Sequence, residues 1–278
     1  MRNVRIRLAY DGSAFYGWQR QEGFESVQEA LEEALESLLG EKLTVFGSGR
    51  TDTGVHALGQ VANFHLDTHL SDNRLLYALN AHLPESVVIS DLETCPDSFH
   101  AQKSAVGKRY LYYVRTTRFR PAFGQKHAHW MPDPLDLSAL REAARHMQGE
   151  HDFSALANAG SPRRSNVRKV SGIRILARRD ALCFLVSGTG FLYNMVRTIA
   201  GTLLEVGRGR IEASEIPELL ASKKRAQAGP TAPAAGLYLL RVFYADPCFQ
   251  SPIFGPRGGP GVFFGTGGNG QVGSVETP

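Results

Sequence analysis

The 278-residue sequence is 42% hydrophobic and 21% charged, with a net charge of +4, a balance typical of a globular chain with one large or two small domains. No apolar run approaches the roughly 20 residues of a membrane span, and the N-terminus lacks the apolar stretch of a signal peptide, so we expect a cytoplasmic protein. Three widely spaced cysteines without a CxxC pair favour neither a disulfide framework nor a thiolate zinc site.

The first half of the chain predicts strands and helices in alternation. Apolar and basic residues alternate over 4–10, which indicates a half-buried strand. Ser26 and Glu29 form a capping-box pattern that starts a helix, and Gly40 ends it. The patterns that follow predict a strand at 42–46, a strand at 60–66, a helix at 71–83 and a strand at 86–90.

The second half repeats this plan and ends in a segment of different composition. It predicts strands at 105–117, 169–177, 181–187 and 237–244, and helices at about 136–148, 191–206 and 213–222. Two successive blocks that mix strands and helices favour an α+β fold with antiparallel sheet over a doubly wound parallel fold. Residues 246–278 are rich in glycine and proline, so we expect a disordered tail without chemistry of its own.

The basic residues are unevenly distributed. Positions 98–132 and 153–179 contain no acidic residue, and each window holds seven Lys or Arg. Phosphate contacts need cations without nearby carboxylates, so the two windows indicate a polyanion across one face. A solvated basic surface explains the same pattern equally well.

The loop GSGRTDTGVHA at 47–57 is the strongest local signal of chemistry. Its glycines allow tight backbone bends around Arg50 and Asp52. A cation beside Asp52 lowers the pKa of the carboxyl group by about 1–3 units, and an ionised carboxylate can act as nucleophile or general base. Alternatively, Asp52 caps a turn and Arg50 is its surface partner. A phosphate cradle is the weaker alternative, because the GxxxxGK[ST] order is absent.

Three further features bear on the chemistry. His56 and His65 have no carboxylate or second histidine at ligand spacing, so we expect structural histidines and no metal. In KRYLYYVR at 108–115, aromatic residues lie among cations, as stacking on unpaired bases requires, although tyrosines also pack sheet cores. Arg197 lies in an apolar helix and needs an acceptor, which is either Asp52 or solvent.

Taken together, the motifs resemble those of the TruA family of tRNA pseudouridine synthases. The resemblance extends over about residues 4–244. Each motif alone is weak, but their order and spacing together are specific. The matching segments are YDGSAFYGWQRQ (10–21), SVQEALEEAL (26–35), GSGRTDTGVHALGQVANF (47–64), SFHAQKSAVGKRYLYY (98–113), HDFSAL (151–156), FLYNMVRTIAGTLLEVG (191–207) and AGPTAPAAGLYLL (228–240).

The resemblance implies an enzyme that isomerises uridine to pseudouridine in the tRNA anticodon arm, at the positions conventionally numbered 38, 39 and 40. It implies a homodimer that uses no cofactor or metal, with one tRNA contacting both subunits. The implied fold has two ferredoxin-like, RNA-recognition-like halves, which we place at residues 1–100 and 101–245. These halves form one continuous, largely antiparallel sheet with helices on one face and a central basic cleft.

The resemblance also assigns residues. Asp52 matches the catalytic aspartate, Tyr110 the active-site tyrosine and Arg197 the arginine that pairs with the aspartate. Gln102 stands where the family usually has arginine, which puts one cationic contact in doubt. From the loop and the basic windows we predict RNA contacts by Arg50, Lys108, Arg109, Arg163, Arg164 and Arg168. The alternative function is a catalytically silent tRNA-binding module on the same scaffold.

Overall fold

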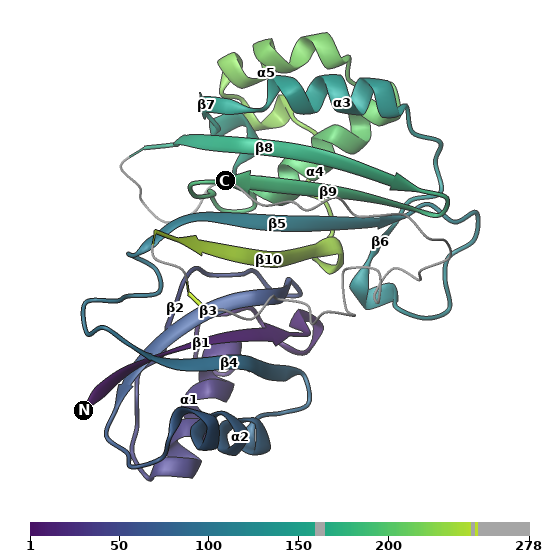
Figure 1. The fold of residues 1–278 in the computed structure, drawn as a ribbon. Helices are drawn as coiled ribbons and strands as arrows, with labels where there is room; N and C mark the ends of the chain where they lie inside the picture. The colour runs from purple at the N-terminus through teal and green to yellow at the C-terminus, as the bar shows by residue number, and fades with distance from the viewer. Residues whose placement is uncertain (159–164, 246–247, 250–278) are drawn as a thin grey trace.

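The computed structural model describes residues 1–158, 165–245, 248 and 249. The N-terminal half begins with a strand that pairs on both sides and continues through two helices (Figure 1). Its elements are β1 (Arg2–Tyr10), α1 (Val27–Leu39), β2 (Phe46–Gly47), β3 (His56–Leu66), α2 (Asp72–His82) and β4 (Val87–Cys95).

The C-terminal half contains three α-helices and the strand that ends the described fold. Its elements are β5 (Ala105–Arg115), β6 (His129–Trp130), α3 (Leu137–His146), β7 (Gly149–Asp152), β8 (Val167–Arg178), β9 (Ala181–Gly188), α4 (Met195–Gly207), α5 (Ile216–Ser222) and β10 (Leu237–Tyr244). This half also contains the short 3₁₀ helices η2 (Gln125–His127) and η6 (Ala234–Gly236).

Within the described residues, ten strands form one sheet of order β4-β1-β3-β10-β5-β9-β8-β7, with β2 beside β3 and β6 beside β5. Most pairs are antiparallel, but β10 runs parallel to β3, with Tyr238 opposite His56 and Leu239 opposite Ala57. The last strand of the described residues, β10, therefore lies in the middle of the sheet and joins its two halves (Figure 1). The predicted α+β class with one continuous, largely antiparallel sheet is confirmed.

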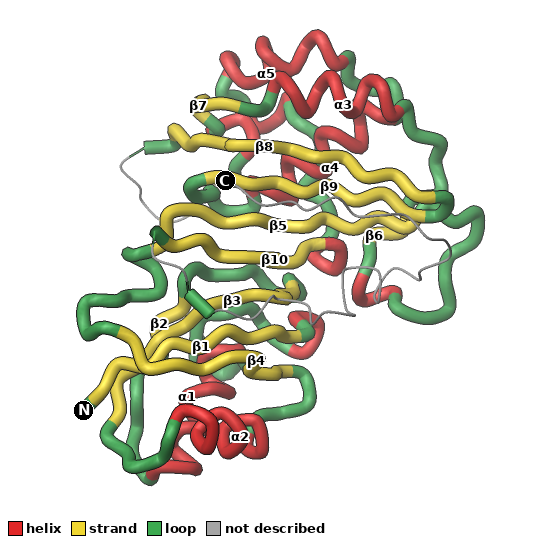
Figure 2. The backbone as a smooth tube through the Cα atoms, in the orientation of Figure 1, coloured by secondary structure: helices red, strands yellow, loops and turns green. Residues whose placement is uncertain are grey.

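The main core lies between one face of the sheet and the helices. On β1, Val4, Ile6 and Leu8 are fully buried, because alternate side chains of a strand point to the same face. They belong to one apolar cluster that includes buried residues of α1 to α5. Figure 2 shows these helices as two groups, one beside each half of the sheet. On the other face, Arg5 and Arg7 pair with Glu93 and Asp91.

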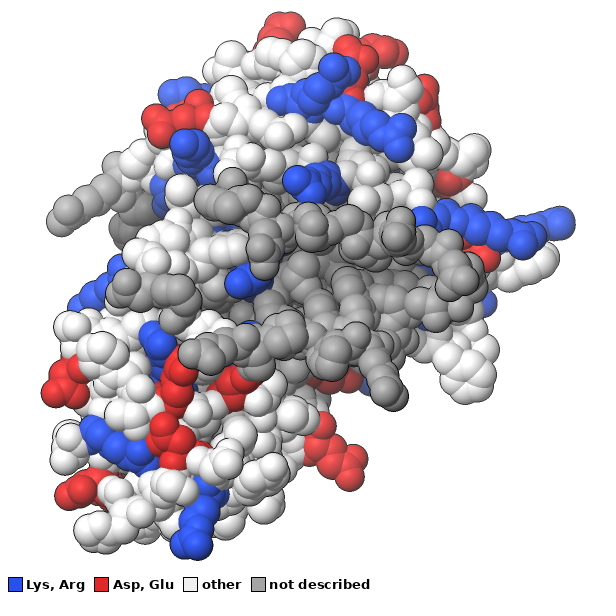
Figure 3. Space-filling model, in the orientation of Figure 1, with Lys and Arg blue, Asp and Glu red and all other residues white. Residues whose placement is uncertain are grey.

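The helix-free face carries both signs of charge. In Figure 3, basic and acidic side chains lie side by side over the N-terminal half, at the bottom of the view. No helix in the described part of the chain is long and apolar enough to cross a membrane. Residues 246, 247 and 250–278, most of the segment for which a disordered tail was predicted, lie outside the described residues.

Several predicted elements differ from the structure at their ends. The predicted strand at 42–46 is wrong except for Phe46, because the N–H of Val45 donates to the Glu32 carboxylate, 3.1 Å away, and not to a strand. β3 begins at His56 and β4 continues to Cys95, since pairing with β10 and β1 extends both strands. The short strands β6 and β7 were missed because two to four residues show no usable periodicity.

Candidate active site

The loop between β2 and β3 brings Asp52 into the space between the two halves. Gly54 has φ +76, a conformation that L side chains rarely adopt. Gly49 leaves room for a close approach, since a Cβ there would lie 2.4 Å from Nζ of Lys108. The loop is also held by a backbone hydrogen bond, in which the main-chain N–H of Trp18 donates to the Thr51 carbonyl, 3.0 Å away. Glycines and neighbouring backbone thus fix the position of Asp52.

Asp52 meets Arg197, which is 145 residues distant in the sequence. Nη1 of Arg197 lies 3.5 Å from Oδ2 of Asp52, and their side chains are 18% and 27% exposed. The expected contact between the two is therefore present, while its catalytic role stays a prediction. The other oxygen of Asp52, Oδ1, accepts a hydrogen bond from none of the described residues. One carboxylate oxygen thus has no hydrogen-bond donor among the described protein groups.

Two neighbours of α4 hold the guanidinium in place. Nε of Arg197 donates to the Ala232 carbonyl at 2.7 Å, and Nη1 also donates to Oδ1 of Asn194 at 2.9 Å. Asn194 has φ 58, so its backbone is left-handed, and α4 begins at the next residue, Met195. Asparagine tolerates this conformation better than most residues. The predicted helix start at 191 is therefore wrong, and the role of Asn194 was missed.

The electrostatics of Asp52 differ from the expectation. Burial raises the pKa of its carboxyl group, and Arg197 lowers the pKa only in part. Arg50 does not contribute, because its Nε donates to Oε1 of Gln19 at 3.1 Å and the side chain is exposed. The prediction that Arg50 steadies Asp52 and lowers its pKa is thus wrong. A carboxylate that burial desolvates is a stronger base than one surrounded by water.

Tyr110 lies on β5, on the face that carries the helices. It is 8% exposed and contacts the Phe191 ring edge-on, with 5.3 Å between ring centroids. Burial raises the pKa of its hydroxyl group above the ordinary value, and the charges of Tyr10 and Asp52 raise it further. The Tyr110 hydroxyl is therefore protonated at neutral pH, close enough to Asp52 to sense its charge.

Lys108 and Arg109 are neighbours in sequence but lie on opposite faces of the sheet. Lys108 shares the face of Tyr110, and its Nζ donates to the carbonyl of Ser48, in the loop that carries Asp52, at 2.9 Å. Burial lowers its pKa. Arg109 donates to Oγ of Ser187 at 2.8 Å and lies 5.3 Å from the centre of the Phe243 ring. Of these two residues, only Lys108 therefore contacts the loop that carries Asp52.

Of the other predicted RNA contacts, the structure describes only Arg168. Nη1 of Arg168 donates to the carbonyls of Val167 and Ser165 at 2.6 and 3.0 Å. Arg163 and Arg164 lie outside the described residues. A cavity of about 630 Å³ between α3 and β8 is lined by none of the residues near Asp52. The central basic cleft stays a prediction.

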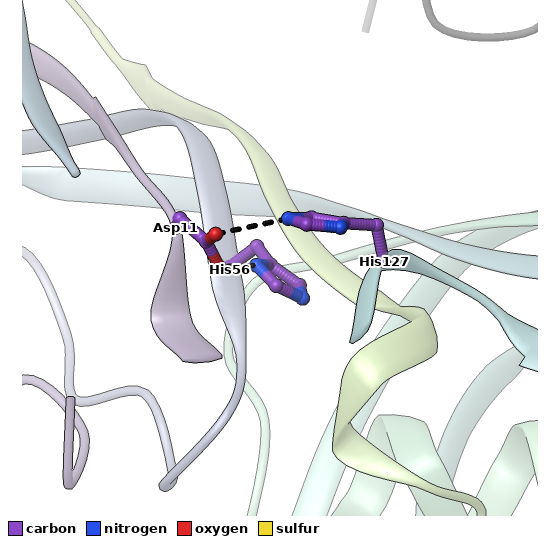
Figure 4. Close-up of side chains that lie close together, drawn as sticks. All are labelled: Asp11, His56 and His127. Carbon is purple, nitrogen blue, oxygen red and sulfur yellow. Dashed lines mark hydrogen bonds and ion pairs between the residues drawn. The ribbon is translucent and has the colours of Figure 1, made fainter. Parts of the chain in front are cut away.

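One group of side chains has the composition of a metal site. Asp11, His56 and His127 have their nitrogen and oxygen atoms within 4.8 Å of one another, and it is the single such group in the described ranges (Figure 4). The statement that His56 lacks a carboxylate or second histidine is therefore wrong, because the fold supplies both. Nδ1 of His56 accepts from the Gly12 N–H at 3.0 Å, and its Nε2–H donates to the Lys126 carbonyl at 2.9 Å.

The hydrogen bonds of these three residues connect segments of the fold. Burial lowers the pKa of His56, so the ring is neutral and both nitrogens are occupied. Burial acts to raise the pKa of Asp11, but hydrogen bonds from Ser13 and His127 bring it below the ordinary value. Nε2 of His127 donates to Oδ2 of Asp11 at 2.9 Å. The group thus links the N-terminal half to the segment before β6.

Comparisons with known proteins agree on one family. The sequence model of a family described as tRNA pseudouridine synthase matches residues 7–102 and 143–245. The chain is 43% identical to a protein named tRNA pseudouridine synthase A from Acetivibrio thermocellus over 244 residues, covering 88% of this chain and all of that protein. It is 43% identical over 245 residues to one from Ruminiclostridium cellulolyticum, with 88% and 100% covered.

A relative of the same name from Shouchella clausii is 42% identical over 250 residues, which cover 90% of this chain and 96% of the relative. Among solved structures, the chain overlaps a Cbf5-Nop10-Gar1 complex with a TM-score of 0.36 and 12% identity, over 87% of this chain and 60% of that chain. This structural overlap is only partial.

Proposed function

The chain belongs to the tRNA pseudouridine synthase family and is an isomerase that acts on uridine in tRNA, and from this premise we propose the uridines it modifies and the residues that carry the reaction. The modified uridines are those at positions 38, 39 and 40 of the anticodon stem-loop, as the resemblance to the TruA family implies. Asp52 is the catalytic carboxylate, and Tyr110 and Arg197 complete the site.

One observation supports this assignment above all others. The loop that carries Asp52 and the helix that carries Arg197 come from different halves of the molecule, and they meet at 3.5 Å. A surface turn has no need of such a partner, and burying a carboxylate is unfavourable unless a cation accompanies it. The turn-capping alternative for Asp52 is thereby disfavoured.

The chemistry suits this set of groups. Making pseudouridine breaks the bond between ribose C1′ and N1, turns the base and joins C1′ to C5, while a proton leaves C5 and N1 gains one. A carboxylate begins the reaction, either by adding to the sugar or the ring or by taking a ribose proton. The Asp52 oxygen without a partner serves this step, and Arg197 keeps the group aimed. Tyr110 is buried and flat, and it stacks on the extruded base and assists proton removal from C5.

The protein also has to extrude a base from a stem. Unstacking costs a few kcal/mol, which contacts to phosphate offset. Arg50 is exposed beside Asp52, and Lys108 lies against the same loop, so these two serve the modified nucleotide. Arg109 and Arg168 contact RNA farther from Asp52. Arg163 and Arg164, which lie outside the described residues, are proposed as RNA contacts from the sequence alone. We further propose that the enzyme acts as a homodimer in which one tRNA contacts both subunits, which sedimentation with and without tRNA tests.

The direct test is Asp52→Asn. This variant is expected to abolish release of tritium from tRNA labelled at C5 of uridine, because the amide can neither add to carbon nor take a proton. Asp67→Asn is the matched control, since the Asp67 side chain is 84% exposed and lies on another loop. Mapping pseudouridine in the treated tRNA identifies the modified positions.

Stability distinguishes loss of chemistry from loss of fold. Burial raises the pKa of Asp52 in the folded state, so the ionised carboxylate destabilises the fold. This destabilisation decreases as the pH falls below the folded pKa, and it is absent below the unfolded pKa. Asp52→Asn is therefore expected to melt no lower than the wild type at neutral pH. Full tritium release by Asp52→Asn excludes the assignment. Tight tRNA binding without tritium release by the wild type indicates the silent binding module instead.

A further inference from the structure

The segment that joins β5 to β6, residues 116–128, here named the arm, exposes both aromatic rings and basic side chains. Phe119 and Phe123 are 74% and 87% exposed. Three cations, Arg118, Arg120 and Lys126, are exposed on the same segment, which lies inside the acid-free window at 98–132. Single exposed apolar residues are ordinary, but two large rings within five residues, flanked by cations, mark a binding surface.

The arm is fixed in position and does not depend on a partner for its shape. Near its start, Nε1 of Trp130 donates to the Thr117 carbonyl at 2.9 Å. Near its end, the Tyr238 hydroxyl donates to the His127 carbonyl at 2.6 Å. His127 itself is bound to Asp11 on the N-terminal half (Figure 4). A surface that is already ordered loses little entropy when a ligand binds.

The base of the arm lies against the catalytic loop. His56, four residues after Asp52, donates to the Lys126 carbonyl in η2. η2 packs against η6, and a Cβ on Gly54 of the catalytic loop would lie 3.3 Å from Cβ of Ala234 in η6. The arm and Asp52 are thus parts of one rigid arrangement. An RNA held at Asp52 meets the arm in a constant geometry.

The chemistry of the arm selects the class of partner. Arg118, Arg120 and Lys126 form no ion pair with any residue the structure describes, and Arg118 lies 5.1 Å from the centre of the Phe119 ring. Cations without carboxylates fit phosphates, and exposed rings beside guanidinium groups fit the flat faces of unpaired bases. A protein partner would find exposed rings but no acidic residue to match its own cations.

We propose that the arm is a second tRNA-binding element, in which Arg118 and Arg120 contact phosphates and Phe119 or Phe123 stacks on an unpaired base. This proposal rests on the action of the chain on tRNA. The arm does not touch the reacting nucleotide. It adds affinity for the part of the tRNA that extends beyond the nucleotide bound at Asp52.

Two double variants test the proposal by tRNA binding at several salt concentrations. Arg118→Ala with Arg120→Ala is expected to reduce the slope of log Kd against log salt by about 1.5, since each phosphate contact contributes about 0.7–0.9. Phe119→Ala with Phe123→Ala is expected to weaken binding about tenfold, the usual effect of losing one base stack, and to leave the slope unchanged. In both variants KM for tRNA rises while kcat stays at the wild-type value.

Matched controls are available elsewhere on the surface. Tyr77 on α2 is also 74% exposed, so Tyr77→Ala removes a ring away from the arm. Arg141→Ala with Arg145→Ala removes two exposed arginines from α3. Wild-type Kd and salt slope in both arm variants overturn the proposal. So does a change of self-association, at unchanged tRNA affinity, in the phenylalanine variant, because that result identifies a protein interface. A wild-type protein that binds tRNA through the arm but releases no tritium contradicts the proposed function alone.

Discussion

At the scale of single residues, Asp52 is held by two opposing influences. Burial makes its ionised form unfavourable, and the Arg197 guanidinium offsets part of that effect. The partial compensation leaves a carboxyl group whose pKa lies above its ordinary value. Perturbed pKa values of this kind are common among catalytic carboxyl groups.

The balance predicts how activity depends on pH. Arg197→Met removes the influence that lowers the pKa of Asp52, so that pKa rises further. Because the ionised carboxylate is the reactive form, the acidic limb of the profile of single-turnover rate against pH moves to higher pH. Arg197→Lys, which keeps the charge but loses the bond to the Ala232 carbonyl, is expected to move it less. An acidic limb unchanged in Arg197→Met contradicts the pairing.

At the scale of elements, α4 depends on the residue before it. Asn194 supplies both a left-handed turn and an oxygen for Arg197, 2.9 Å away. Asn194→Ala is expected to lose about 1 kcal/mol of unfolding free energy, because alanine is strained at φ 58, and to lose activity as well. Asn194→Gly relieves the strain but not the lost contact, so it keeps its stability and loses activity. Denaturant unfolding and tritium release separate the two effects.

Local signals in the sequence predicted the elements that depend on local physics. The Ser26 cap and Gly40 bound α1, and the apolar pattern gave β10 with its observed ends, Leu237 and Tyr244. Alternation along β5 already implied that Lys108 and Arg109 face opposite sides, although the charge pattern grouped them. The absence of a strand at 42–45 could not be predicted, because the N–H of Val45 donates to Glu32, a residue of another element.

The site was only partly predictable for a similar reason. The resemblance to the TruA family paired Asp52 with Arg197, and the structure places them in contact. The meeting of Asp11, His56 and His127 joins positions 45 and 116 residues apart, which no local pattern encodes. The direction of the Asp52 pKa was predicted wrongly, because burial depends on packing that the sequence does not display.

At the scale of the whole molecule, the two halves share one core and one sheet. The main apolar cluster contains residues of both, and β10 pairs with β3 on one side and β5 on the other. The division into α+β halves at residues 1–100 and 101–245 stays a prediction. The structure favours cooperative unfolding of both halves together.

The two tryptophans allow this to be measured, since Trp18 lies in the first half and Trp130 in the second. Trp130→Phe leaves Trp18 as the only indole, and Trp18→Phe leaves Trp130. In each variant, denaturant unfolding followed by fluorescence is expected to coincide with unfolding followed by circular dichroism. Separate midpoints within one variant would show that the halves unfold independently.

The central place of β10 has a consequence for how the protein is made. Synthesis proceeds from the N-terminus, so β3 and β5 both leave the ribosome before β10, and each has an unpaired edge until that strand is made. Ala232, whose carbonyl holds Arg197, also arrives late. A nascent chain interrupted before these residues has neither a closed sheet nor a working centre, so premature termination yields no partly active product.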